Sequence, residues 1–370
     1  MQALIQYTGF AAIFYVVAYV SALIVIVFVH EMGHFLVGRW CGVRIDAFSI
    51  GFGPELWGFV DKKGTRWKLC AIPLGGYVKF EGDANAASMP DHKAVYSPTS
   101  LPGAKLYRRA LIVVAGPIAN FILSIAIFAA AFGFVGVPIS QPRVGEIVVG
   151  GAAEAAGLKA GDLITSIDGK PMAAFSDLQD AMILHAEEPA TLHVDRGGSQ
   201  LEFQLTPKIT EIDDGLGGKA RMAQIGIRSD GKYVLQRATP VEAVAKGVER
   251  TWFICNMTLR FVGKMFTGQE SLSQLHGPVG VAKAAGDTAL MGVWPFVFFI
   301  GLISVSIGLI NLFPIPMLDG GHLLFYLIEA VLGRPVSPQT QEWGFRIGLS
   351  ALLVLMVVVS TKDVFSLLNH

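Results

Sequence analysis

Charged residues are scarce in this sequence. Asp, Glu, Lys and Arg make up 16% of its 370 residues, and equal numbers of basic and acidic side chains leave a formal net charge of zero. Nucleic-acid-binding proteins carry a basic excess, so we expect no nucleic-acid partner. Hydrophobic residues reach 52%, and the mean hydropathy is +0.53. This composition predicts a multi-span membrane protein that also carries some soluble mass, with the lipid bilayer as its main partner.

Cysteine is also rare. Cys41, Cys70 and Cys255 are far apart in the sequence, and no two of them form a CxxC pair. This spacing indicates neither a disulfide framework nor a zinc site made of thiolates. We interpret the three cysteines as ordinary apolar packing residues.

Charge is missing altogether from residues 1–29, 110–142, 288–318 and 347–361. A helix needs about 20 apolar residues to cross a bilayer, and the shortest of these runs is flanked by basic side chains that can extend to the interface. A cleaved signal peptide is an alternative for the first run. It has no basic residue before it, however, and exceeds the usual ~7–15 apolar residues. We therefore expect four transmembrane helices.

Basic residues near the ends of these runs indicate the orientation. No charge precedes the first run, whereas the connection that follows it contains Arg39, Arg44, Lys105, Arg108 and Arg109. Short connections rich in Lys and Arg are typically cytoplasmic, so we expect this one in the cytoplasm. The N-terminus and the long segment between the second and third spans would then lie outside, because long domains translocate whatever their charge.

A short motif ends the first apolar run. His30 and His34 are four residues apart in an HExxH pattern, so one helix face presents both imidazoles to a single metal ion. Glu31 follows the first histidine. In zinc metalloproteases with this spacing such a glutamate is the general base, so the motif predicts a catalytic Glu31 beside two metal ligands.

A third ligand is expected at the end of the third apolar run, on the same side of the membrane. Asp319 stands there, and Pro314 and Pro316 would break the helix just before it and turn the carboxylate inward. Two histidines and one carboxylate leave a fourth position open, as in catalytic Zn²⁺ sites. The alternative is that Asp319 only caps a helix that begins near Gly320.

These motifs together resemble the site-2 protease family of intramembrane zinc metalloproteases, in particular its RseP-like group (regulator of sigma-E protease). The resemblance rests on His30 to His34, on Asn311 to Gly321 with its Leu-Asp-Gly-Gly end, and on Gly116-Pro117-x-x-Asn120. It implies substrate binding by Asn311, Pro314 and Pro316. For Asn120, helix packing and a direct role both remain open.

The resemblance also implies an activity and a location. It implies a zinc metalloendopeptidase of the bacterial inner membrane, with its active site near the cytoplasmic leaflet. The substrates would be single-pass membrane proteins, such as anti-sigma factors or remnant signal peptides. They would be cut within or near their spans after prior trimming, in regulated intramembrane proteolysis.

Two regions outside the spans show strand patterns. Segments 43–50, 65–69 and 75–80 alternate like strands, with a turn at 61–64. They either have only structural duties or hold an unwound substrate along a strand edge. Residues 144–171 contain a Gly-Leu-x-x-Gly-Asp-x-Ile core that resembles a bacterial PDZ domain, followed by a helix near 175–186 and a hairpin at 190–206. Such domains bind extended peptides or C-termini. Only one such core is found, whereas well-known relatives carry two.

The expected fold is thus a polytopic α-helical membrane protein with four transmembrane helices, a cytoplasmic-side β-hairpin or sheet loop, and an inserted extracytoplasmic (periplasmic) PDZ domain of α+β type. The expected divisions are 1–38, the first transmembrane helix with HExxH; 39–108, the membrane-associated β loop and linker; 109–137, the second transmembrane helix; 138–208, the PDZ domain; 209–290, a periplasmic linker with amphipathic helices; 291–321, the third transmembrane segment with the Leu-Asp-Gly-Gly motif; and 322–370, a short helix and the fourth transmembrane helix.

Two other classes of function compete with this hypothesis. A catalytically silent PDZ membrane scaffold would be favoured if the metal motifs were degraded, but both are intact. A metal transporter would need polar residues along a continuous path, and the second and fourth spans have almost none.

Overall fold

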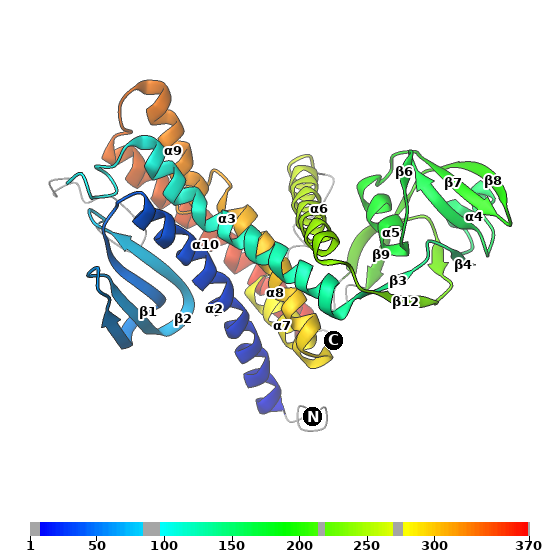
Figure 1. Ribbon diagram of the computed structural model, residues 1–370, viewed down its shortest axis with the longest axis horizontal. Coiled ribbons are helices and arrows are strands. Elements are labelled where there is room, and N and C mark those ends of the chain that lie inside the picture. Colours follow the sequence, from blue (N-terminus) through cyan, green and yellow to red (C-terminus); the bar gives the residue numbers. More distant parts are fainter. Residues whose placement is uncertain (1–7, 84–96, 214–218, 269–276, 369–370) are drawn as a thin grey trace. The chain divides into compact units, whose positions relative to one another are not determined.

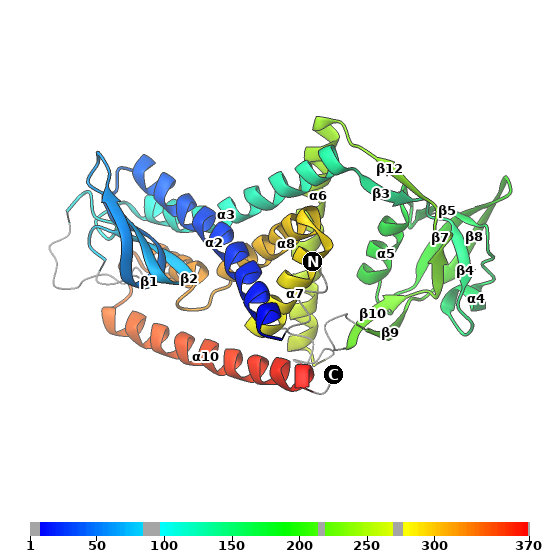
Figure 2. The same ribbon diagram turned by 90° about the horizontal axis from the view of Figure 1, so that it is seen from below.

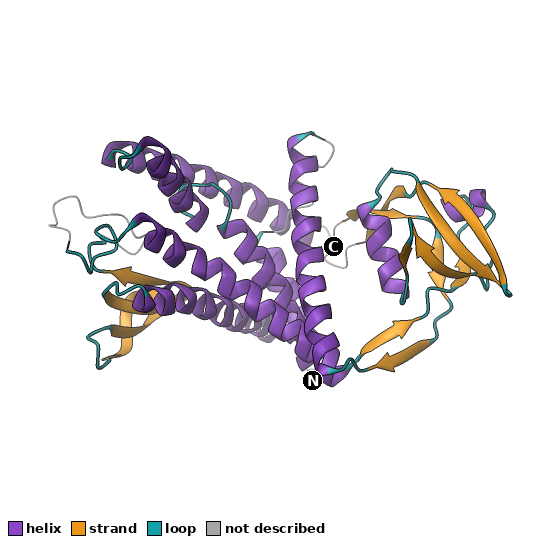
Figure 3. Cartoon of the chain, turned by 45° about the horizontal axis from the view of Figure 1, so that its top comes forward, coloured by secondary structure: helices purple, strands orange, loops and turns teal. Residues whose placement is uncertain are grey.

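The computed structural model describes residues 8–83, 97–213, 219–268 and 277–368. Contacts between residues divide the chain into two compact units. The first unit combines the described residues up to Ala129 with Val244–Phe365, and the second combines Ala130–Ala243 with the described residues from Ser366 onward. Figure 3 shows helices dominating the first unit and strands dominating the second.

Four helices in the described part of the chain are long and apolar enough to cross a membrane. They are α2 (Thr8–Trp40), α3 (Leu106–Ala130, continued by a π-helical turn at Ala131–Val135), α8 (Val293–Asn311) and α10 (Pro338–Leu368), shown in Figures 1 and 2. The expectation of four apolar spanning helices is confirmed at this level of length and composition. The first unit also contains α7 (Pro278–Met291), α9 (Asp319–Leu332) and most of α6 (Pro240–Phe266).

Helix α2 is contacted along its length by the rest of the first unit. Near its start, the Tyr15 hydroxyl donates a 2.7 Å hydrogen bond to Asp287 of α7. Further along, Ala22 and Ile26 pack with Ile300 of α8 in a buried apolar cluster. These contacts fix the helix that carries the HExxH motif.

Helix α7 is held to the end of α10 by one buried carboxylate. Asp363 accepts main-chain hydrogen bonds from Gly277 and Gly280 at 2.8 and 2.9 Å. A negative side chain at a helix N-terminus satisfies free N–H groups and complements the helix dipole. The capping carboxylate therefore ties α10 to α7.

A small sheet lies beside the last part of α2. Strands β1 (Ile45–Val60) and β2 (Arg66–Phe80) are joined by the predicted turn at 61–64 and pair in an antiparallel sheet. The predicted strand segments are confirmed, but β1 continues beyond residue 50, through Gly51 and Gly53. Both glycines have positive φ, and the strand bends through them with shifts in register.

The pairing register places the segment from Gly76 to Phe80 at an edge of this sheet. Residues 47–50 pair both with 66–69 and with 76–79, so they occupy an inner position. Among the described residues, no other strand pairs with this sheet. The segment from Gly76 to Phe80 therefore leaves one side of its backbone unpaired by any described strand.

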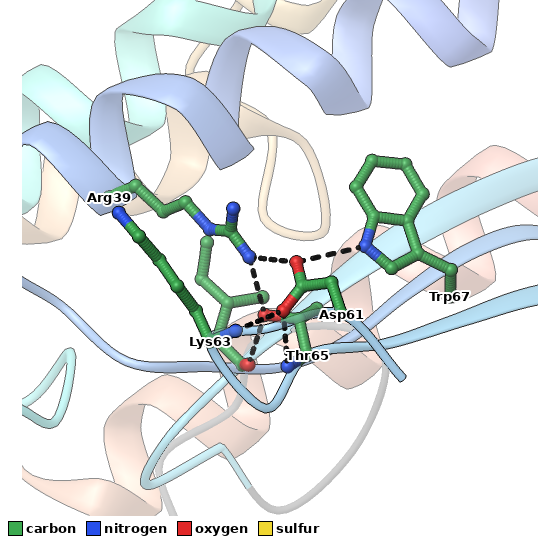
Figure 4. Close-up of polar contacts among 6 residues, drawn as sticks. Arg39, Asp61, Lys63, Thr65 and Trp67 are labelled. Carbon is green, nitrogen blue, oxygen red and sulfur yellow. Dashed lines mark hydrogen bonds and ion pairs between the residues drawn. The ribbon is translucent and has the colours of Figure 1, made fainter. Parts of the chain in front are cut away.

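One carboxylate fastens the turn of this sheet to α2, as Figure 4 shows. Asp61 forms an ion pair with Arg39 in the last turn of α2, and accepts a 3.2 Å bond from the Trp67 indole. The main-chain N–H groups of Lys63 and Thr65 donate to its other oxygen at 2.8 and 3.1 Å. Burial raises the pKa of Asp61, but these hydrogen bonds outweigh burial and lower it to about 2.

Aromatic packing reinforces the same junction. The Phe48 ring is fully buried between Phe35 of α2 and Trp67 of β2, with ring centroids at 5.4 and 4.5 Å. Large aromatic side chains contribute much of the energy of such a contact. Aromatic packing therefore holds the sheet against α2.

The second unit has its own apolar core. Its main sheet has the order β6-β5-β7-β8, and it is accompanied by the pairs β3–β12, β4–β11 and β9–β10. The strands are β3 (Val137–Ser140), β4 (Val144–Ile147), β5 (Leu163–Ile167), β6 (Lys170–Pro171), β7 (Ala190–Arg196), β8 (Ser199–Leu205), β9 (Lys208–Asp213), β10 (Lys219–Gln224), β11 (Ile227–Ser229) and β12 (Tyr233–Gln236). Two helices, α4 (Ala152–Ala156) and α5 (Phe175–Leu184), complete it. The helix near 175–186 and the hairpin at 190–206 are confirmed.

A buried ion pair stabilises this second unit. Asp162 is 1% exposed and receives two 2.7 Å bonds from the Arg196 guanidinium. Burial raises the pKa of the Asp162 carboxyl, but its arginine partner outweighs this and holds the pKa below the ordinary value. Asp162 belongs to the Gly-Leu-x-x-Gly-Asp core, so the motif has a structural duty in the fold.

Candidate metal centre

Three polar side chains converge in the first unit. His30 and His34 come from α2, and Asp319 is the first residue of α9. The two Nε2 atoms lie 3.2 Å apart, and they lie 3.1 and 3.5 Å from Asp319 Oδ2. Both histidines are 8% exposed. The three residues predicted as metal ligands are thus brought together.

The spacing of these three atoms fits a zinc ion. Two ligand atoms each about 2.0–2.1 Å from a tetrahedral zinc are about 3.3 Å apart, close to all three observed separations. Asp319 Oδ2 is buried without a hydrogen bond of good geometry, although both Nε2 atoms lie within 3.5 Å of it, and a cation beside this carboxylate would offset the cost of its burial.

Helix α3 leaves the space that such an ion needs. A Cβ atom at Gly116 would lie 2.2 Å from His34 Nε2 and 2.8 Å from His30 Nε2. Only glycine allows the backbone of α3 to come this close to the two imidazoles. The donor set and this opening both fit the zinc site expected from the sequence.

The helical conformation is interrupted between α8 and α9, directly before Asp319. Helix α8 ends at Asn311, residues 312–318 are not α-helical, and Met317 has a φ of 89°. At Gly320, a Cβ would lie 2.1 Å from the Phe313 carbonyl oxygen, so the turn folds tightly back on the helix. The N-cap of α9 is Leu318, and no side-chain bond caps the helix. Asp319 therefore faces the histidines, and the helix-cap alternative is not what the structure shows.

Glu31 lies beside the cluster in a cavity that strand β2 helps to line. The cavity is lined by His30, Glu31, His34 and Asp319, together with Gly76, Tyr77 and Val78 of β2. A Cβ at Gly76 would lie 3.2 Å from Glu31 Cγ, so the edge segment of β2 contacts the helix at this acid. The acid predicted as a general base thus shares one cavity with the cluster and the strand edge.

The other predicted site residues fall in two places. Asn311 lines the same cavity. Pro314 and Pro316 are not among its lining residues. Pro316 instead packs against α10, where a Cβ at Gly348 would lie 2.3 Å from the Pro316 carbonyl oxygen.

The sequence did not predict how α3 and α9 complete the site. His322 and Tyr326 of α9 line the cavity, one and two turns after Asp319. Arg109 of α3 pairs with Glu329 of α9, with a 3.0 Å bond between Nη1 and Oε2, and its guanidinium lies 5.0 Å from the Tyr326 ring centroid. The helical spacing of residues 319, 322, 326 and 329 would have indicated one shared face of α9.

These features are those of a multi-pass membrane protein with a His-His-Asp cluster that could hold a metal ion and an acid beside it. The profile of Peptidase family M50 matches residues 18–355. The chain belongs to this family.

Similar proteins extend over the whole chain. One from Agrobacterium fabrum, named "Putative zinc metalloprotease", is 47% identical over 100% of both chains. A protein of the same description from Rhizobium meliloti is 46% identical, covering 92% of this chain and 94% of its own. "Metalloprotease MmpA" from Caulobacter vibrioides is 35% identical over 94% of each chain.

Solved structures match parts of the chain, and one of them is a PDZ domain. The PDZ domain of the SdrC-like protein from Listeria monocytogenes covers 25% of this chain and 86% of its own, at 24% identity and a TM-score of 0.18. A likeness this slight does not establish the fold of the second unit.

Proposed function

We propose that this protein hydrolyses peptide bonds within or next to the membrane span of single-pass membrane proteins, as a zinc metalloendopeptidase. Membership of Peptidase family M50 and the names of the relatives support the metallopeptidase activity. The observation that carries the proposal is the tetrahedral spacing of His30, His34 and Asp319 in a cavity shared with Glu31.

Five residues that line the cavity have roles in this proposal. His30, His34 and Asp319 hold the zinc ion. When bound, zinc polarises a carbonyl as a Lewis acid and makes water nucleophilic at neutral pH. Glu31 takes the proton from the attacking water and returns it to the leaving amine. Asn311 lies at the cavity and donates its amide N–H to the substrate carbonyl oxygen, which becomes negative in the transition state.

A transmembrane substrate must be unwound before it can be cut. Inside a helix every peptide group is hydrogen-bonded, and an unwound segment in lipid needs new partners. The edge from Gly76 to Phe80 supplies them, because most of it lines the cavity and one side of it is paired with no described strand. The substrate would add to this edge as an extended strand, with its scissile bond toward the metal.

The remaining parts of the proposal concern location and partners. We infer that the second unit is a single periplasmic PDZ domain that binds a peptide or a C-terminus, since its Gly-Leu-x-x-Gly-Asp core and its helices and strands match that expectation. The metal site would lie near the cytoplasmic leaflet of a bacterial inner membrane. Prior trimming of the substrate would precede the cut, in regulated intramembrane proteolysis of anti-sigma factors or remnant signal peptides.

Matched variants of the purified full-length protein test the proposal. Glu31→Gln keeps the size of the side chain but removes the base, so it should cut a reconstituted single-pass substrate at least ~100-fold more slowly than wild type. A zinc chelator should abolish the wild-type reaction. Glu55→Gln, a change at an exposed acid of β1, should leave the rate unchanged. Equal cleavage by wild type and Glu31→Gln would sink the proposed chemistry, whereas no cleavage by the wild type would favour the catalytically silent scaffold.

A further inference from the structure

The Asn120 side chain of α3 contacts His30, a proposed zinc ligand, on the side of the ring away from the metal position. Its side chain is fully buried, and its amide lies 3.2 Å from Nδ1 of His30. The nitrogen that faces the metal position in this imidazole is the other one, Nε2. Asn120 and the cluster therefore meet opposite sides of the same ring.

The chemistry of imidazole decides which atom of the amide must face His30. A neutral imidazole carries one proton, and a nitrogen that binds a metal carries none. If Nε2 binds zinc, the proton is on Nδ1, and that nitrogen donates. The atom of Asn120 opposite Nδ1 must then be an acceptor, which is the amide oxygen.

The surroundings of Asn120 permit this orientation. The amide nitrogen of Asn120 is assigned to the position opposite Nδ1, whereas Oδ1 is buried without a hydrogen-bond partner. The two ends of an amide have nearly the same shape and are assigned from their hydrogen bonds. Exchanging them breaks no bond of Oδ1 and gives it a donor. The exchange therefore improves the hydrogen bonding on the oxygen.

We propose that Asn120 is a positioning residue for the metal site: its side-chain oxygen accepts the His30 Nδ1 proton and so fixes the tautomer and ring direction of this ligand. The inference rests on the proposed zinc function. It explains why Asn120 stands one turn after Gly116, since one face of α3 provides both the opening for the ion and the bond behind the ligand.

The second histidine has an equivalent partner on the same helix. His34 Nδ1 lies 2.8 Å from the Ile112 main-chain oxygen, which can only accept. That bond fixes the His34 proton on Nδ1 and leaves Nε2 free for the ion. Both imidazoles thus bond through Nδ1 to groups of α3, and these two bonds orient the rings.

A role in helix packing alone must be separated from this one. The main-chain oxygen of Asn120 accepts bonds from Ser124 and Ser304 at 2.9 and 3.0 Å, and a Cβ on Gly308 of α8 would lie 3.1 Å from Asn120 Cβ. The Ser304 bond and the Gly308 contact join α3 to α8, as does the 2.9 Å bond from Ser124 to the Gly301 carbonyl oxygen, and none of them involves the side-chain amide. Ser124→Ala removes one of them and leaves His30 untouched, so it is the matched control.

The test compares zinc affinity in three full-length variants in detergent, measured by competition with a chromogenic chelator. Asn120→Leu keeps the volume but removes the acceptor, and should weaken zinc binding ~10- to 100-fold. Asn120→Asp keeps an acceptor opposite Nδ1 and should bind within about threefold of wild type or more tightly. Ser124→Ala should bind as wild type does.

Two further readouts separate positioning from packing. The visible spectrum of the Co²⁺-substituted protein should change in Asn120→Leu and be restored in Asn120→Asp, because it reports ligand geometry. The midpoint of thermal unfolding of the metal-free protein should fall no further in Asn120→Asp than in Ser124→Ala.

The outcomes are distinct. Wild-type zinc affinity in Asn120→Leu, or loss of affinity in Asn120→Asp equal to that in Asn120→Leu, would overturn the positioning role. If Asn120→Leu does not fold, the affinity of Asn120→Asp decides alone. Failure of the wild type itself to bind zinc would instead defeat the proposed function.

Discussion

His30 Nε2 and His34 Nε2 face each other at 3.2 Å, and both point at the same oxygen of Asp319. When both imidazoles carry their protons on Nδ1, the two Nε2 atoms present lone pairs that repel one another and the carboxylate oxygen at these separations. A cation between the three atoms removes the repulsion and gives the buried carboxylate a partner. The geometry of the cluster therefore fits that of a ligand set.

Removing the carboxylate ligand should empty the site. Asp319→Asn keeps the shape of the side chain but loses the negative charge. We expect zinc affinity to fall by at least ~100-fold, a larger loss than for Asn120→Leu, which changes a residue that contacts a ligand and not the ion. Zinc content after dialysis against a chelator measures this. Asp287→Asn, which alters another carboxylate in the first unit, should keep its zinc.

The space at Gly116 should be as important as the ligands. Gly116→Ala would place a methyl group 2.2 Å from His34 Nε2, so we expect loss of both zinc and cleavage. Gly263→Ala is the control, because it lies in helix α6 with no atom within 4 Å of the new Cβ. A zinc content of Gly116→Ala equal to wild type would show that α3 does not border the ion.

The Asp61 carboxylate should stabilise the protein above pH 4. Its pKa falls from 3.8 unfolded to about 2 folded, so its stabilisation is complete above the unfolded value and is lost as the pH falls toward 2. A shift of this size is worth roughly 2 kcal/mol for a shielded group, and partial exposure reduces the expected effect of Asp61→Asn to about 1 kcal/mol.

Thermal unfolding in detergent checks this dependence. Asp61→Asn should unfold about 1–2 °C below wild type at pH 6, and the gap should narrow as the pH falls from 4 toward 2. Glu55→Gln, which breaks an exposed pair with Arg66, should show a smaller gap at pH 6. A gap for Asp61→Asn that is independent of pH would contradict the linkage.

The proposed orientation can be read from each side of the membrane. In a protein without its three native cysteines, Lys62→Cys at the sheet turn should react with an impermeant reagent only from the cytoplasmic side. Ser199→Cys in the second unit should react only from outside. Both positions are exposed. Labelling with the two sides exchanged would invert the topology.

Much of the site was predictable because its signals are local. The i, i+4 spacing of His30 and His34 fixes two ligands on one helix face, and the prolines before Asp319 mark the break that turns it inward. Charge-free runs likewise gave the four spanning helices, since the bilayer sets their length.

The rest depends on contacts between distant segments. The sequence around Gly116 does not indicate that the backbone of α3 approaches two imidazoles at this residue. It also does not indicate that the Asn120 side chain lies beside His30. The pairing of residues 47–50 with two segments of β2 also follows from bends that positive-φ glycines allow, which strand periodicity does not reveal.

The most direct test of the proposed cleavage within or next to a membrane span is the position of the cut. A single-pass substrate is reconstituted in liposomes with the full-length protein, and the ends of both products are read by mass spectrometry. We expect zinc-dependent cleavage of one bond within the hydrophobic span or at its border, and no such cleavage by the Glu31→Gln variant. An uncut substrate, or cuts confined to its water-exposed parts, would contradict it.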